Sequence, residues 1–166
     1  MNATQTIRSA LRMSYEWIKP LADDLADAPL TSPTPGEGNH PMWIMGHLTF
    51  SSAGLLAMIS GEPSPCEDGK DFFQGGTLPS YDAGVYPSYG DVLGTYEQTH
   101  RATLALLDEL GEARLDEKPV AVWSELQDAP DFQSNGRLFL FIAMHEMSHR
   151  GQLADARRVL GRKPFA

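Results

Sequence analysis

Two histidines four residues apart, His145 and His149, are the side chains in this sequence best suited to chemistry. They lie in segment 134–161, which has the apolar periodicity of a helix, and residues four apart stand one above the other on one helix face. Two imidazoles placed in this way can bind the same metal ion. Alternating steps of four and three residues predict the inner face of this helix as Leu138, Ile142, His145, His149, Gln152, Ala156 and Val159.

That inner face carries polar side chains where apolar ones are expected. A buried imidazole costs free energy unless it is hydrogen-bonded or bound to a metal. One inward histidine is usually a hydrogen-bonded core residue, whereas two stacked neighbours favour a metal site. We therefore predict that His145 and His149 bind a metal, with a pair of hydrogen-bonded core histidines as the alternative.

A third histidine, His47, is the only ionisable side chain in segment 42–60. It lies beside the main apolar stripe of that predicted helix, so the periodicity permits it to point inward without requiring it. Gly46 and Gly54 in the same helix would let a neighbouring helix or a ligand approach closely.

The residues from His145 to His149 also match H-E-x-x-H, the zinc metalloprotease pattern in which the glutamate is the general base. No histidine or glutamate follows as a third ligand, Glu146 lies off the predicted inner face, and no strands are predicted to bind an extended peptide. A protease is therefore disfavoured. Glu146 remains a candidate catalytic base, as does His100, which could instead be a hydrogen-bonded core histidine of the third helix.

Four helical segments position these residues: 3–26, 41–60, 88–111 and 134–161. Pro20 should kink or end the first, His40 should lie near the start of the second, and Ser88 with Asp91 should cap the third. Connection 62–87 is long enough to cross a bundle, which would let the second and third helices run parallel. These features predict an all-α four-helix bundle, formed as a single domain from residues 1–166.

Composition excludes several classes of function. The formal charge of −9 opposes binding to nucleic acids, and the single cysteine, Cys66, allows no internal disulfide and fits a cytoplasmic protein. Residues 38–60 contain no charged side chain and approach the length of a membrane span, but their polar and small residues are more typical of a buried helix in a soluble bundle. We therefore expect neither a nucleic acid nor a membrane as a partner.

Two segments, NHPMWIMGHL (39–48) and HEMSHRGQL (145–153), resemble the DinB/YfiT-like family of metal-dependent enzymes. The resemblance implies that His47, His145 and His149 bind one divalent ion, such as zinc, nickel, iron or manganese. It also implies an up-down-down-up bundle and a homodimer, for which the apolar circumference of the second helix is a second reason. The activities that it implies are thiol S-transfer with a low-molecular-weight thiol, or metal-dependent hydrolysis of a small molecule.

Three imidazoles would leave one or more positions on such an ion open, which is typical of catalytic rather than structural sites. An open position could activate a thiol or a water molecule. The alternative from another class is a non-catalytic bundle that binds a metal or a small ligand. A fourth protein ligand in the open position would favour that alternative.

Overall fold

The computed structural model of the chain describes residues 1–32, 34 and 38–164. Its four long helices are α1 (Ala3–Asp23), α2 (Pro41–Ser60), α4 (Tyr89–Leu110) and α5 (Asn135–Val159). A short helix, α3 (Lys70–Phe73), lies in the connection between α2 and α4. No strand occurs in the described part of the chain, so the predicted all-α helical bundle is confirmed.

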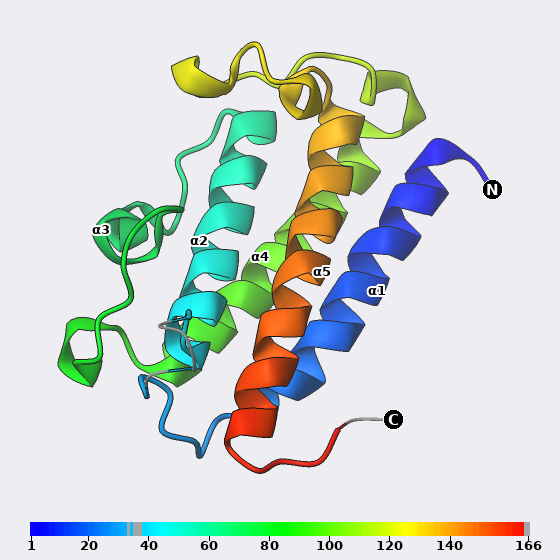
Figure 1. Cartoon of the computed structure of the whole chain (residues 1–166). Coiled ribbons are helices and arrows are strands. Elements are labelled where there is room, and N and C mark those ends of the chain that lie inside the picture. The colour runs from blue at the N-terminus through cyan, green and yellow to red at the C-terminus, as the bar shows by residue number, and fades with distance from the viewer. Residues whose placement is uncertain (33, 35–37, 165–166) are drawn as a thin grey trace.

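The four long helices form a ring in which each packs against two neighbours. Helix α1 contacts α5 and α4, and α2 contacts the same two helices. In Figure 1, α2 and α4 run in one direction and α1 and α5 run in the other. The connection that carries α3 therefore returns along the side of α2, which places segment 61–88 against that helix.

Local sequence signals determine where the helices begin and end. The Asn2 side chain accepts from the Gln5 amide at the start of α1, and Ser88 and Ser134 do the same for α4 and α5. At the start of α2, His40 Nδ1 accepts from the Trp43 amide, so the expected position of His40 at a helix cap is confirmed. Helix α1 ends at Asp23 rather than at residue 26, within one turn of Pro20, which cannot donate a backbone hydrogen bond.

Helix α2 is the most apolar of the four long helices. Its length and composition would suit a membrane span, but most of the helix is buried inside the bundle. This burial is typical of the core helix of a globular protein. It also removes one reason for expecting a homodimer, because the bundle itself covers the apolar circumference of α2.

Two hydrophobic clusters lie toward the two ends of the bundle. One contains Leu153 of α5 together with the N-terminal half of α2, and the other contains Ile142 and Ala143 of α5 together with the C-terminal half of α2. His145 and His149 fall between them along α5. The apolar clusters thus hold the polar middle of the α2–α5 contact in place from both sides.

Candidate metal centre

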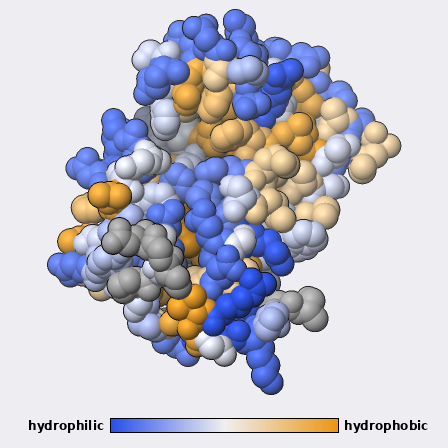
Figure 2. All heavy atoms as spheres, in the orientation of Figure 1, coloured by the Kyte–Doolittle hydropathy of each residue, from blue (hydrophilic) through white to orange (hydrophobic). Residues whose placement is uncertain are grey.

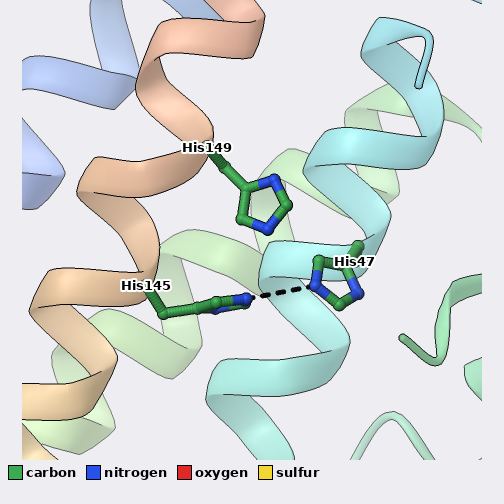
Figure 3. A group of neighbouring side chains, drawn as sticks. All are labelled: His47, His145 and His149. Atoms are coloured by element: carbon green, nitrogen blue, oxygen red, sulfur yellow. Dashed lines mark hydrogen bonds between the residues drawn. The ribbon is translucent and has the colours of Figure 1, made fainter. Parts of the chain in front are cut away.

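The structure brings His47, His145 and His149 together between α2 and α5 (Figure 3). One ring nitrogen from each lies within 4.8 Å of the other two, and Nε2 of His47 is 3.1 Å from Nε2 of His145. Two nitrogens bound to one tetrahedral zinc ion lie about 3.3 Å apart, so the His47–His145 pair already has close to the spacing of two ligands of one ion. This is a three-histidine group that could hold a metal.

Hydrogen bonds at the outer nitrogens fix the protonation of two of these rings. His47 Nδ1 lies 2.7 Å from the carbonyl oxygen of Phe73, and His149 Nδ1 lies 3.2 Å from Oε1 of Gln152. A carbonyl oxygen only accepts, so each Nδ1 must carry the proton that it donates. The Nε2 atoms of His47 and His149 are therefore unprotonated, as metal ligands require, and in the metal-free protein Nε2 of His47 accepts from Nε2 of His145.

His145 is less constrained than the other two. Its Nδ1 is buried and has no hydrogen-bond partner among the described residues, while its Nε2 faces Nε2 of His47. The ring of Phe141 stacks on it at a centroid distance of 5.9 Å. A buried imidazole whose one polar contact is another imidazole nitrogen is poorly satisfied, and a shared cation would satisfy it. The donor set therefore fits a divalent metal ion.

Burial also keeps the three imidazoles neutral. It lowers the pKa of His47, and burial together with the neighbouring His149 and His47 lowers the pKa of His145 to about 4. The pKa of His149 is lowered by burial and by His47. Neutral imidazoles near pH 7 bind metals without first releasing a proton.

Glu146 does not join this group. Its side chain is only 2% exposed and points between α1 and α4, where its carboxylate accepts from the Ser14 hydroxyl and, at 3.0 Å, from the Tyr96 hydroxyl. Burial raises the pKa of the Glu146 carboxyl to about 7, and the two hydroxyls oppose that rise. The expectation that Glu146 lies outside the buried face of α5 was wrong.

The predicted inner face of α5 needs a wider correction. Leu138, Ile142, His149 and Ala156 are buried as predicted, but Gln152 is exposed and Val159 is 53% exposed. Glu146 and Leu153 are buried instead. Steps of 3.5 residues drift away from the 3.6-residue period of a straight helix, so the error grew along α5.

His100, the other candidate base, lies on the α1 side of α4. Its ring stacks on Tyr15 at a centroid distance of 4.1 Å, and Tyr15 in turn stacks on Tyr96. Burial and the charge of Arg12 lower the pKa of His100 to about 4. The structure thus places neither candidate base in the three-histidine group.

Sequence reasoning did not assign to the site two residues that contact its candidate ligands, or a third that contacts Gln152. The Trp43 ring stacks on His47 at 4.7 Å, the Phe73 carbonyl binds His47 Nδ1, and Asn39 Nδ2 lies 3.5 Å from the Gln152 oxygen that binds His149. Asn39 and Trp43 belong to the first of the two resembling segments, so a signal for both was present. Phe73 had none, because a backbone carbonyl carries no side-chain signature.

Cys66 lies in the connection between α2 and α4, and burial raises the pKa of its thiol. A thiol with a raised pKa stays protonated near pH 7 and is therefore a poor nucleophile.

A family model described as the DinB superfamily matches residues 10–153 of the chain. The chain belongs to the DinB superfamily. The match includes all three histidines together with α2, α4 and most of α1 and α5. No individual curated protein and no solved structure matches the chain. The family is commonly metal-dependent, which is consistent with the three-histidine group.

Proposed function

We propose that this protein is a metal-dependent enzyme that binds one divalent ion through His47, His145 and His149 and transfers a small thiol to an electrophile. The observation that carries the proposal is the convergence of three neutral imidazoles, two of which have Nδ1 bound to a carbonyl oxygen. A bound ion would supply Lewis acidity to a thiol or a water molecule in its open positions.

The surroundings of the histidines favour thiol transfer over hydrolysis. Among the described residues, no aspartate, glutamate or cysteine joins the three histidines as a further ligand or a nearby base. Glu146 and His100 face α1, so we assign neither of them a step. A thiol held by a metal is deprotonated by coordination and needs no such base, whereas attack by water is commonly assisted by one.

A cavity beside the site supports a small-molecule substrate. It has a volume of about 590 Å³ and adjoins Gln152, whose side chain binds His149. That volume is in the range of small-molecule sites. The cavity is lined by Thr34, Gly38, Asn39, Gln152, Asp155, Ala156, Arg158 and Val159.

The experiment is elemental analysis of protein purified without added metal, followed by zinc and cobalt titration and two assays. One assay measures loss of a low-molecular-weight thiol in the presence of an electrophile, and the other measures ester and amide hydrolysis. We expect one ion per chain and metal-dependent thiol loss. A matched His40→Ala variant should keep both, since His40 caps α2 and binds the Ser80 carbonyl instead.

Two results would change this proposal. Hydrolysis without thiol transfer would make the enzyme a hydrolase. Stoichiometric metal with no turnover in either assay would support the non-catalytic metal-binding bundle.

We also propose a homodimer, now on a different surface. Met13 and Trp17 of α1 and Leu140 and Met144 of α5 are exposed large apolar side chains, and Figure 2 shows apolar surface over these two helices. A second copy would cover such surface. Light scattering at micromolar concentration tests this, and a monomeric mass would contradict it.

A further inference from the structure

The connection between α2 and α4 is attached to one face of α2 by three side-chain hydrogen bonds. His40 Nε2 donates to the Ser80 carbonyl at 2.8 Å, Trp43 Nε1 to the Thr77 hydroxyl at 3.0 Å, and His47 Nδ1 to the Phe73 carbonyl at 2.7 Å. The donors ascend α2 in steps of three and four residues, and the acceptors descend the connection in the same steps. Segment 73–80 therefore runs antiparallel to α2, with a metal-ligand candidate at one end of the row.

Gly46 makes this arrangement possible. A Cβ atom at Gly46 would lie 2.1 Å from the Phe73 ring, which occupies the space beside the helix. The Phe73 ring is only 4% exposed and stacks on Tyr86 at 5.4 Å. The absence of a side chain at residue 46 thus lets the connection lie close enough for the Phe73 carbonyl to reach residue 47.

Trp43 holds the same imidazole from another side. Its indole is nearly parallel to the His47 ring, with an interplanar angle of 8° and a centroid distance of 4.7 Å. The Thr77 hydroxyl, which accepts from the indole N–H, also lies 2.9 Å from the Phe72 and Gln74 carbonyls of the same turn. The hydroxyl of Thr77 therefore links the turn after α3 to the ring that packs on His47.

We infer that segment 73–80 is a positioning element of the metal centre, which orients His47 through the Phe73 carbonyl and through the Trp43–Thr77 hydrogen bond. This inference rests on the proposed function, because it takes the three histidines to bind a metal. Thr77 and Gly46 are positioning residues that touch no ion themselves. Metal binding and the docking of this segment on α2 are then coupled, so that each strengthens the other.

The test is zinc and cobalt titration of the full-length wild type and of three threonine variants. Thr77→Val removes the acceptor for Trp43, and we expect it to weaken zinc binding by about 10-fold, the lower end of what loss of a direct outer contact to a metal ligand costs, because Thr77 acts through Trp43. Thr77→Ser retains a hydroxyl and should bind zinc like the wild type. In Thr77→Val the visible absorption bands of bound cobalt should also shift, because the indole that packs on the His47 ring is no longer held by Thr77.

The matched control is Thr103→Val in α4. Thr103 is buried, and its hydroxyl donates to the Thr99 carbonyl at 2.8 Å, away from the connection. This variant loses a threonine hydrogen bond of its own, and we expect zinc affinity within about threefold of the wild type. Equal losses in Thr77→Val and Thr103→Val would assign the effect to general destabilisation and overturn the inference.

Hydrogen exchange provides a second measurement that does not depend on any variant. Zinc should slow exchange in segment 73–80 of the wild type as well as around His145 and His149. Slowing confined to α5 would overturn the inference while leaving the metal site intact. A wild type that binds no zinc would refute the proposed function itself, and the inference with it.

Gly46→Ala provides the sharpest steric test of the same idea. The added methyl group should displace Phe73 and weaken zinc binding, and Phe73→Leu in the same chain should restore part of the affinity by vacating the space. No loss in a folded Gly46→Ala protein would count against the role of the Phe73 carbonyl.

Discussion

Neighbouring residues of α5 serve two contrasting polar regions of the bundle. On the α2 side, His145 and His149 meet His47, the Nε2 atoms of His47 and His149 are unprotonated, and Nδ1 of His145 has no partner among the described residues. On the α1 and α4 side, both carboxylate oxygens of Glu146 have a hydroxyl donor, from Ser14 and Tyr96. The histidine group therefore still offers nitrogen atoms to a cation. The hydrogen bonds of the Glu146 carboxylate, by contrast, are all supplied by the protein itself.

This contrast teaches that burial of polar groups does not by itself identify a functional site. Glu146 is more deeply buried than His47 and His149, its pKa is displaced about as far as that of His145, and it also matches the H-E-x-x-H pattern. Its hydrogen bonds nevertheless assign it a structural place that links three helices. The convergence of three neutral imidazoles and the unpartnered Nδ1 of His145, rather than the depth of burial, distinguish the candidate metal centre.

The largest effect should come from removing a ligand. His145→Ala and His149→Ala should each weaken zinc binding by more than the roughly 100-fold that loss of an outer contact costs. Glu146→Gln, one residue from His145, should bind zinc like the wild type. Competition with a chelator of known affinity measures the zinc affinity of all three variants. If Glu146→Gln failed to bind zinc, Glu146 would belong to the metal centre and the two regions would not be functionally distinct.

Substitution of Glu146, which should not affect zinc binding, should instead lower the stability of the fold. Glu146→Ala leaves the buried Tyr96 hydroxyl without an acceptor and opens a cavity, and we expect a loss of about 2–3 kcal/mol in the free energy of unfolding. Glu146→Gln keeps an oxygen for Tyr96 and should lose less than about 1 kcal/mol. Urea denaturation of metal-free protein gives both values. A loss as large for Gln as for Ala would mean that the negative charge itself is required.

The four-helix architecture was predictable because it depends on local signals. Apolar periodicity, the caps at His40, Ser88 and Ser134, and the stop at Gly61 lie in the sequence itself. The three histidines were also found in advance, two from their spacing and the third chiefly from the resemblance. The connection that orients His47 was not, because its contribution is a backbone carbonyl brought close by long-range packing. The sequence did indicate, through Gly46, that another part of the molecule could approach α2 closely. It did not indicate that the approaching residue is Phe73.

A smaller effect concerns the dependence of stability on pH. The pKa of His100 is about 4 in the folded chain, below its ordinary value of 6.5, so the unfolded chain binds this proton more readily. The contribution of the neutral ring to stability is therefore complete above pH 6.5 and is lost as the pH falls toward 4. His100→Phe should remove about 1 kcal/mol of that loss, less than the full pKa difference because the ring is partly exposed.

Unfolding of metal-free wild type and His100→Phe across pH 4 to 8 measures this difference. The two proteins should diverge only below pH 6.5. Parallel curves throughout would mean that His100 titrates normally and that the α1–α4 region is more open to solvent than its packing indicates.

The smallest effect on metal binding should follow from His40→Ala. This change removes the cap of α2 and the outermost of the three hydrogen bonds to segment 73–80, at a cost of about 1 kcal/mol in stability. Zinc affinity should stay within about threefold of the wild type, because the two inner hydrogen bonds remain. Calorimetric titration of zinc checks this, and a tenfold loss would show that the outer end of the segment also holds His47.

The separation of the ligands along the chain has a consequence for how the protein is made. His47 and His145 are 98 residues apart, so the full set of donors exists only after α2 and α5 have come together. An ion present earlier would meet only the pair on α5. The chain must therefore fold on its two hydrophobic clusters alone, unlike a zinc finger that folds around its ion. At the proposed metal site, loading would then follow the packing of α2 against α5.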